Sequence, residues 1–188
     1  MNANFESLWS PIKDMTGEYS IDEVSLRYVY GAVSKEPLPT NPVFLELGVC
    51  HGRTLAFLSR WAAAVGGSAY GIDNFLMVEG THEEVIREFT SRGLTNWKVI
   101  ASDSRTVDWS IPIDILIVDG GHDEEVVSVD IEKYVPFVKQ RGYVFFHDYD
   151  EPYTRDSCHW AIRYYADQAC GKWKPVGRVK SLKGWRKP

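Results

Sequence analysis

The segment from residue 43 to residue 54, VFLELGVCHGRT, constrains the fold of this chain more than any other. Five residues that suit a buried strand, Val43 to Leu47, run directly into a turn bounded by Gly48 and Gly52. A stretch with helical spacing follows. In α/β proteins this order of strand, glycine turn and helix forms a nucleotide-sized pocket, because glycine lets the backbone approach a ligand and the first N–H groups of the helix face it. The segment therefore predicts an α/β protein with a ligand site at this turn.

The charge and spacing of the turn argue against a dinucleotide as its ligand. A dinucleotide fingerprint has the pattern G-x-G-x-x-G, which holds a pyrophosphate. Here Glu46 lies within the end of the strand, and three residues separate Gly48 from Gly52. The Glu46 carboxylate would repel a pyrophosphate, but it would attract a ligand that carries an ammonium and a sulfonium.

The composition is that of an ordinary globular chain. It has 188 residues, of which 44% are hydrophobic and 25% are charged, and this is enough to build a full core. We expect a single domain over residues 1–188, with a helical N-terminal cap segment over 1–40 and a core over 43–188. The net charge of −5 argues against a general nucleic-acid binder.

The cysteines and the apolar runs predict a cytoplasmic protein. Cys50, Cys158 and Cys170 are odd in number and form no C-x-x-C pair, so a reducing compartment fits best. The first residues do not resemble a secretion signal. No stretch approaches the ~18 uninterrupted apolar residues of a membrane helix, so we expect no membrane association.

Strand-like and helix-like segments alternate along most of the chain. The alternation predicts a mostly parallel sheet with right-handed crossovers, and two final strand-like runs predict an antiparallel hairpin. Capping boxes at residues 20–23 and 81–84 mark two helix starts. Residues 1–18 are expected to be irregular, and Gly142 is expected to end the fourth helix. The predicted strands cover residues 43–47, 68–72, 97–101, 113–118, 143–146, 173–180 and 182–187, and the predicted helices cover about 20–33, 53–65, 81–93, 126–138 and 157–169.

Polar residues follow the second and third predicted strands. Because ligands bind at the carboxyl ends of parallel strands, Asp73 could accept both hydroxyls of a ribose. The alternative is an Asp that only stabilises a turn, and together with Glu46 and the glycine turn we favour the ribose. Asp103 and Ser104 could bind an adenine amine or form an Asx turn, and the residues alone do not decide between these.

A second polar group follows the fourth and fifth predicted strands. Asp119, His147 and Asp148 end neighbouring strands, so their side chains could converge on a divalent ion that lowers the pKa of a substrate hydroxyl. His122, on the loop after Asp119, could accept the hydroxyl proton. Taken singly, such residues are more often helix caps or hydrogen-bonded histidines. Taken together, they favour a site made of a metal ion and a base.

These motifs resemble those of the class I S-adenosylmethionine-dependent methyltransferases. ELGVCHG is similar to the first motif of that family and YGID to the second. The stretch from residue 114 to residue 151 is similar to small O-methyltransferase-like domains, including macrocin-O-methyltransferase-like and cephalosporin-hydroxylase-like proteins. The resemblance implies a Rossmann-like, seven-stranded sheet in the order 3-2-1-4-5-7-6 with strand seven antiparallel and helices on both faces.

The resemblance also implies roles for individual residues. S-adenosylmethionine would be the cofactor, with its ribose at Asp73 and its adenine side at Asp103 and Ser104. In metal-dependent relatives the ligands correspond to Asp119, which also lies at the cofactor, with His147 and Asp148, and the base is at the position of His122. Since Mg²⁺ prefers oxygen, a histidine ligand favours Mn²⁺, Fe²⁺ or Zn²⁺, or no metal. The methionine half of the cofactor would be held by Glu46, Gly48, Val49 and Gly52.

The sequence thus predicts an enzyme that methylates a hydroxyl of a small acceptor, a sugar or natural product, and that could form a homo-oligomer. Three alternatives stay open. A basic C-terminal tail could serve an RNA methyltransferase, although the same charges protect edge strands from pairing. The chain could be a non-catalytic cofactor-binding scaffold, or a hydroxylase, for which it offers no separate oxygen-activating cluster.

Overall fold

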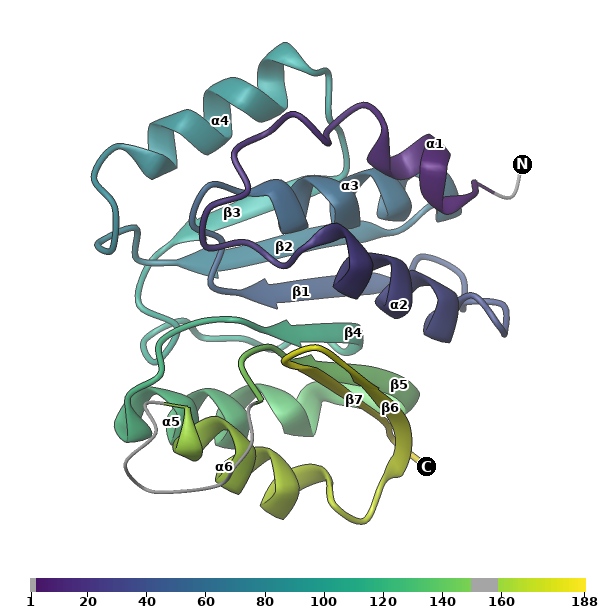
Figure 1. Ribbon diagram of the computed structural model, residues 1–188, viewed down its shortest axis with the longest axis vertical. Coiled ribbons are helices and arrows are strands. Elements are labelled where there is room, and N and C mark those ends of the chain that lie inside the picture. Colours follow the sequence, from purple (N-terminus) through teal and green to yellow (C-terminus); the bar gives the residue numbers. More distant parts are fainter. Residues whose placement is uncertain (1–2, 150–158) are drawn as a thin grey trace.

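The computed structural model describes residues 3–149 and 159–188, and within them seven strands form one sheet (Figure 1). The strand order is β3-β2-β1-β4-β5-β7-β6, as predicted. Strands β1 to β5 pair in parallel, whereas β7 is antiparallel to both β5 and β6. The strands are β1 (Val43–Leu47), β2 (Ser68–Asp73), β3 (Trp97–Ala101), β4 (Ile113–Val118), β5 (Val138–Phe146), β6 (Lys174–Val179) and β7 (Leu182–Arg186).

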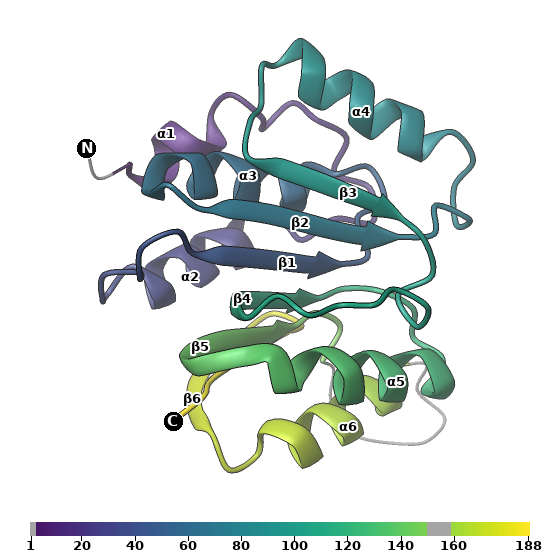
Figure 2. The ribbon, with the colours of Figure 1, turned by 180° about the vertical axis from the view of Figure 1, so that it is seen from behind.

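Helices cover both faces of this sheet. One hydrophobic cluster joins α1 to α4 to the face that carries Phe44, and a second joins α5 and α6 to the face that carries Leu116. Seen from behind, α5 and α6 lie together beside β4 and β5 (Figure 2). Strand β4 is buried along its whole length, which explains its apolar sequence. The helices are α1 (Phe5–Trp9), α2 (Glu23–Val33), α3 (Arg53–Val65), α4 (Thr81–Ser91), α5 (Glu124–Tyr134) and α6 (Trp160–Cys170).

The starts of α2 and α4 differ from the predicted capping boxes. The cap of α2 is Asp22, whose side chain accepts a hydrogen bond from the backbone N–H of Ser25 at 3.0 Å. Helix α4 follows Gly80, which has a left-handed backbone and no side chain to cap with. The Thr81 hydroxyl instead donates to the Val78 carbonyl at 2.8 Å. The predicted start of α4 at Thr81 is therefore confirmed although Thr81 does not cap the helix, whereas α2 begins at Glu23, three residues after the expected Ser20 cap.

The boundary between α5 and β5 also differs from the prediction. Helix α5 ends at Tyr134, a short 3-10 turn spans Val135–Phe137, and β5 then begins at Val138. Pro136 cannot donate a backbone hydrogen bond, so the α-helix stops before it. Gly142, expected to end the helix, lies inside β5. Among residues 1–18, α1 is helical rather than irregular, and the first two positions of the predicted last helix, 157 and 158, lie outside the described residues.

The C-terminal hairpin is confirmed, and several of its basic side chains bind within the chain. Arg186 pairs with Glu36 at 2.6 Å, and Lys180 Nζ donates to Asp22 at 3.0 Å. Lys187 Nζ donates to a backbone carbonyl of β5 at 2.7 Å. These contacts join the hairpin to the helical N-terminal segment and to the sheet, which leaves the tail less suited to an anionic partner. No helix within the described ranges is both long and apolar enough to cross a lipid bilayer.

Candidate functional site

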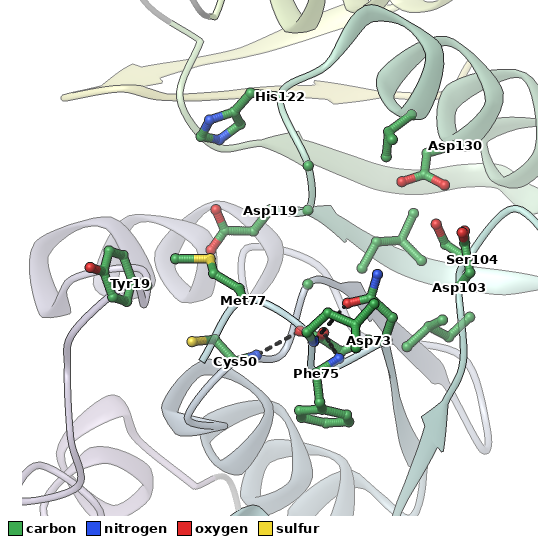
Figure 3. A pocket seen from close by; sticks show the side chains of 18 of the residues that line it. Tyr19, Cys50, Asp73, Phe75, Met77, Asp103, Ser104, Asp119, His122 and Asp130 are labelled. Carbon is green, nitrogen blue, oxygen red and sulfur yellow. Dashed lines mark hydrogen bonds between the residues drawn. The ribbon is translucent and has the colours of Figure 1, made fainter. Parts of the chain in front are cut away.

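A pocket of about 890 Å³ opens at the carboxyl edge of the sheet (Figure 3). Its walls come from the ends of the five parallel strands, from the loop over residues 74–78, and from Tyr19 and Ser20 ahead of α2. This volume lies within the ~300–1,000 Å³ that is usual for small-molecule sites. The lining is acidic, and its carboxylates are Asp73, Asp103, Asp119, Asp123, Asp130 and Asp148.

Gly48 allows the ends of β1 and β4 to meet at the floor of the pocket. Its φ is +86°, and a Cβ at this position would overlap the carbonyl oxygen of Asp119. Its N–H donates to the Ile72 carbonyl at 2.9 Å. Gly48 lines the pocket, whereas Val49 and Gly52 are not among the lining residues. The turn is therefore built from glycine because of both its backbone angle and its lack of a side chain.

Replacing Gly48 with Ala is expected to destabilise the fold, and Gly80→Ala is the matched control. Gly80 has a similar φ of +81°, but a Cβ there would meet nothing within 4 Å. Backbone strain alone should cost Gly80→Ala about 1 kcal/mol, a Tm loss of roughly 2–4 °C. The added clash should make the Gly48→Ala loss at least about twice as large. Equal Tm losses by calorimetry would show that close packing against Asp119 is unimportant.

The Asp73 carboxylate organises the glycine turn. Its Oδ2 accepts from the backbone N–H groups of Val49 at 2.7 Å and Cys50 at 2.8 Å, and its Oδ1 accepts from that of Phe75 at 2.6 Å. A carboxylate has about four acceptor positions, so one stays available to the pocket that Asp73 lines. The structure thus shows that Asp73 stabilises the turn, whereas its binding of a ribose stays a prediction.

Glu46 lies behind the pocket rather than in its wall. Its side chain is 1% exposed and is not among the lining residues. Its Oε2 has no hydrogen-bond partner within the described part of the chain. Burial, with repulsion from Asp119 and Asp73, raises the pKa of Glu46 well above its ordinary value. Glu46 therefore lies beneath the turn, where it could attract a cationic ligand only across the protein atoms that separate it from the pocket.

Asp103 and Ser104 lie at the end of the pocket away from Tyr19, and both already have hydrogen-bond partners. The Arg105 guanidinium pairs with Asp103 at 2.6 Å and holds the pKa of that carboxyl below its usual range. The Ser104 carbonyl accepts from the Tyr134 hydroxyl at 2.7 Å. Both residues line the pocket, so the structure gives Asp103 an Asx-type turn with Arg105 and leaves an adenine contact untested.

The three predicted metal ligands converge. His147 Nδ1 lies 2.8 Å from Asp119 Oδ1 and 3.4 Å from Asp148 Oδ2. The ring nitrogen is close enough to ion-pair with both carboxylates, but it is not aligned for a hydrogen bond with any described residue. The three donor atoms lie within 4.8 Å of one another. Two carboxylate oxygens and one imidazole nitrogen that converge in this way are a donor set that would suit a divalent cation.

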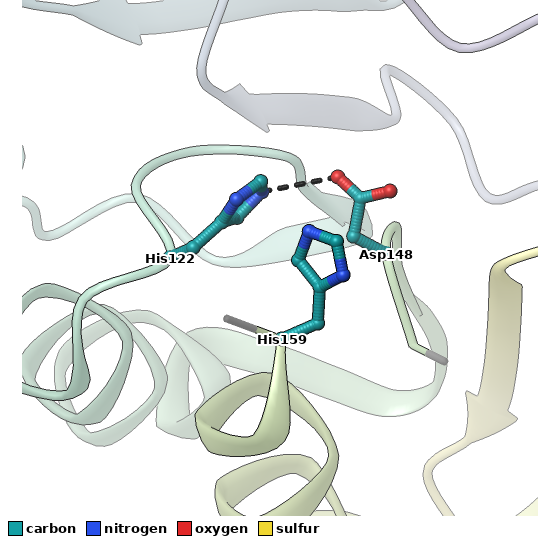
Figure 4. Close-up of side chains that lie close together, drawn as sticks. All are labelled: His122, Asp148 and His159. Carbon is teal, nitrogen blue, oxygen red and sulfur yellow. Dashed lines mark ion pairs between the residues drawn. The ribbon is translucent and has the colours of Figure 1, made fainter. Parts of the chain in front are cut away.

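The predicted base, His122, adjoins this group through Asp148. Its Nε2 lies 3.0 Å from Asp148 Oδ2 (Figure 4). The ring of His159 meets the His122 ring edge-on, with centroids 4.5 Å apart. His122, Asp148 and His159 form a second set whose donor atoms lie within 4.8 Å of one another. The sequence assigned His159 to a helix, whereas it lies just before α6 and beside the pocket cluster.

Four titratable groups at this side of the pocket shift one another's pKa values. They are Asp119, His122, His147 and Asp148. Burial raises the pKa of Asp119 despite the adjacent His147 imidazole. Burial alone would lower the pKa of His147, but Asp119 and Asp148 outweigh it and raise that pKa to about 10. His147 and His122 together hold the pKa of Asp148 below its usual range in spite of burial. Asp148 in turn raises the pKa of His122. Charges of both signs are thus held at one rim of the pocket.

Sequence reasoning expected residues 1–18 and the loops over 74–80 and 149–157 to shape the acceptor site. Residues 74–78 do line the pocket and residues 150–157 lie outside the described part of the chain, but Tyr19 and Asp130 were missed. Tyr19, Leu76 and Met77 place large apolar side chains at the pocket, and Asp130 places a buried carboxylate in its wall. The apolar residues lie in segments without periodicity. In the sequence, Asp130 is only one of several polar positions of a helix, and nothing marks it as buried. Cys50 has a positive φ of 46°, and burial raises its pKa to about 11, as suits a turn residue rather than a nucleophile.

Comparisons with known proteins agree with this fold. Residues 45–149 match a family model described as a methyltransferase domain. No curated protein matches the chain significantly. Similar solved structures include PaMTH1 from Podospora anserina, bound to S-adenosylhomocysteine, with a TM-score of 0.70 and 11% identity over 98% of this chain and 87% of that one.

Two further solved structures have the same fold. An rRNA methylase from Streptococcus thermophilus has a TM-score of 0.65 and 15% identity over 89% of this chain and 99% of its own. CalS11, a TDP-rhamnose 3′-O-methyltransferase of calicheamicin biosynthesis, has a TM-score of 0.63 and 14% identity over 99% of this chain and 96% of its own. At such identities the likeness concerns the fold alone.

Proposed function

Because the chain belongs to the methyltransferase domain family, we propose that it methylates a hydroxyl oxygen of a small acceptor, a sugar or natural product. The chain is an S-adenosylmethionine-dependent methyltransferase. A sulfonium is a strong methyl donor, so the enzyme has to align oxygen, methyl and sulfur and to deprotonate the oxygen. The observation that carries the proposal is the convergence of Asp119, His122, His147 and Asp148 at one side of the pocket.

The donor would lie along the floor of the pocket. The acidic lining suits its ammonium and sulfonium charges, and the glycine turn at Gly48 lets its methionine half approach the backbone. Its ribose would meet the free acceptor position of Asp73, and its base would extend towards Asp103 and Ser104. The S-adenosylhomocysteine bound by PaMTH1 supports a donor of this type.

A divalent ion would be held by Asp119, His147 and Asp148. The nitrogen donor favours Mn²⁺, Fe²⁺ or Zn²⁺ over Mg²⁺. Such an ion, when bound, lowers the pKa of an acceptor hydroxyl. His122 would take the proton from that hydroxyl, because it lines the pocket and its side chain is 38% exposed.

The rim of the pocket supports an acceptor with an apolar body. Leu76, Met77 and Tyr19 are the most exposed large hydrophobic side chains of the described residues, at 83%, 64% and 58%, and all three line this pocket. Figure 3 shows Met77 near Asp119, with Tyr19 farther out on the same side. Exposed apolar side chains gathered at one cavity mark a binding surface. They fit an acceptor whose reactive hydroxyl adjoins a hydrophobic ring or chain.

Replacing Leu76 and Met77 together with Ser is expected to raise KM for an apolar hydroxylated acceptor by about tenfold, with kcat much less affected. An acceptor that covers part of both side chains would lose apolar contact worth ~1–2 kcal/mol in total. The exposed side chains contribute little to the fold, so the Tm should hold. Val24→Ser is the matched control, because Val24 is 51% exposed and does not line the pocket. An unchanged KM in the double variant would place the acceptor elsewhere.

An RNA acceptor is the second candidate, since the similar Streptococcus thermophilus structure is an rRNA methylase. The pocket gives it little support. Of the lining residues, Arg105 is the single Lys or Arg, and it is paired with Asp103. An RNA backbone would meet six carboxylates there. Affinity for RNA that falls steeply with salt would favour this candidate, whereas weak, salt-independent binding would favour the small acceptor.

Turnover with a panel of probes tests the proposal directly. The chain would be incubated with S-adenosylmethionine and phenolic, sugar and aglycone acceptors, with Mn²⁺ or with EDTA, and S-adenosylhomocysteine release would be measured. We expect release that depends on an acceptor, is lost with EDTA and returns with Mn²⁺. Tight binding of S-adenosylhomocysteine without any turnover would indicate a non-catalytic scaffold instead. If EDTA did not change turnover, the reaction would not need a metal ion.

A further inference from the structure

The two histidines and the carboxylate of Figure 4 form a group of metal-binding side chains that the proposed reaction does not account for. His122 comes from the loop after β4, Asp148 from the loop after β5, and His159 from the position just before α6. Figure 4 shows the three side chains pointing towards one another. His159 neither lines the donor pocket nor belongs to the ligand set of Asp119 and His147, so its place in this group needs a separate explanation.

The spacing of the three donor atoms suits a single tetrahedral ion. Bonds of about 2.0–2.2 Å in a zinc site place neighbouring ligand atoms roughly 3.4 Å apart. His122 Nε2 and Asp148 Oδ2 are 3.0 Å apart, and all three donor atoms lie within 4.8 Å of one another. The two imidazole rings meet edge-on, with an angle of 87° between their planes. Because all three side chains are only partly buried, small rotations would bring their donor atoms around one ion.

The donor chemistry of this group differs from that of the first ligand set. His122, Asp148 and His159 offer two imidazoles and one carboxylate, whereas Asp119, His147 and Asp148 offer one imidazole and two carboxylates. Imidazole suits Zn²⁺ and its neighbours in the transition series, while carboxylates and water suit Mn²⁺ and Mg²⁺. Three protein ligands leave the fourth position of a tetrahedral zinc site open to water. The two sets should therefore prefer different ions, although they share Asp148.

We propose that His122, Asp148 and His159 form a second metal site, selective for a nitrogen-preferring divalent ion such as Zn²⁺, and that an ion bound there stops methyl transfer. The ion would take the ring nitrogen of His122 that otherwise accepts the proton of the acceptor hydroxyl. It would also draw the shared Asp148 away from the first ligand set. The inhibition rests on the proposed function, in which His122 is the base, whereas the binding of the ion rests on the geometry alone.

Titration of the Asp119→Asn variant with Zn²⁺ tests the second site separately from the first. This variant has lost a carboxylate of the first ligand set and keeps all three donors of the second. By calorimetry on metal-free protein, adding His159→Ala to this variant should weaken Zn²⁺ binding at least about tenfold. Loss of a group that only orients a metal ligand already costs about 10–100-fold, and His159 would be a ligand itself.

His82→Ala, added to the same Asp119→Asn variant, is the matched control. His82 belongs to neither donor set, so its removal should leave Zn²⁺ affinity unchanged. Equal Zn²⁺ affinities with and without His159 would overturn the site. The titrations need neither a methyl donor nor an acceptor, so the site is tested even if the proposed O-methylation fails.

Inhibition of turnover tests the consequence of binding. Zn²⁺ added to the wild-type chain with S-adenosylmethionine, acceptor and Mn²⁺ should abolish turnover. Without Zn²⁺, His159→Ala should keep kcat/KM within about threefold of wild type, since His159 lies outside the proposed base and first ligand set. Half-inhibition of this variant should need at least about tenfold more Zn²⁺. Equal inhibition of both proteins would show that Zn²⁺ acts at the first ligand set, and a wild-type chain that Zn²⁺ does not inhibit would overturn the inhibitory role without any variant.

Discussion

Replacing Asp119 with Asn is expected to lower methyl transfer by about three orders of magnitude and to weaken Mn²⁺ binding at least about tenfold. Asp119 supplies one of two carboxylates in the predicted ligand set and lies 2.8 Å from His147. Losing its charge removes several kcal/mol of electrostatic stabilisation where the acceptor oxygen becomes negative, at ~1.4 kcal/mol per factor of ten. Asn keeps the shape of the side chain, so the loop and the contact with Gly48 should persist.

Asp123→Asn is the matched control for this experiment. Asp123 lies on the same loop and lines the same pocket, but its side chain makes no capping hydrogen bond and belongs to neither donor set. We expect its turnover to stay within about threefold of wild type. Electron paramagnetic resonance would report bound Mn²⁺ separately from activity. If Asp119→Asn bound Mn²⁺ normally and turned over normally, the ion would not be held where we place it.

The sheet could be read from the sequence because its determinants are local. The runs Val43–Leu47, Trp97–Ala101 and Ile113–Val118 are bounded by turn residues, and the structure reproduces all three ranges. The strand order came from resemblance and is confirmed. The predicted starts of α3 and α4 are confirmed, whereas the start of α2 was wrong because a neighbouring side chain caps the helix. Asp22 outcompeted the expected Ser20 cap, an outcome that depends on backbone geometry within one turn.

The site was only partly predictable, for a different reason. Strand ends of a parallel sheet meet at one edge, so Asp119, His147 and Asp148 could be brought together from the topology alone. His159 could not, since its approach to His122 depends on how α6 packs against α5. Asp130 was hidden for the same reason, because the burial of one helical carboxylate is a property of the assembled pocket.

His122 offers the second large effect. Replacing it with Ala is expected to lower kcat/KM at pH 7 by about 10²–10³-fold, the contribution usual for a general base. The wild-type profile should rise with pH through the pKa of His122, because only the neutral imidazole accepts a proton. Asp148 stabilises the charged form and raises this pKa above 6.5, so the rise should occur above that value. A divalent ion on Asp148 would offset this effect and move the rise to lower pH.

The shape of the pH profile separates a base from a merely structural histidine. Without His122 the rise should vanish or move to the pKa of the acceptor itself, so that the deficit shrinks as the pH increases. His82→Ala is the control, because His82 packs on Phe75 outside both donor sets, and its profile should match wild type. A variant at 122 that lost activity equally at every pH, with the rise unchanged, would contradict proton transfer to His122. The proton would then leave the acceptor by another route, and the imidazole would act by orienting Asp148.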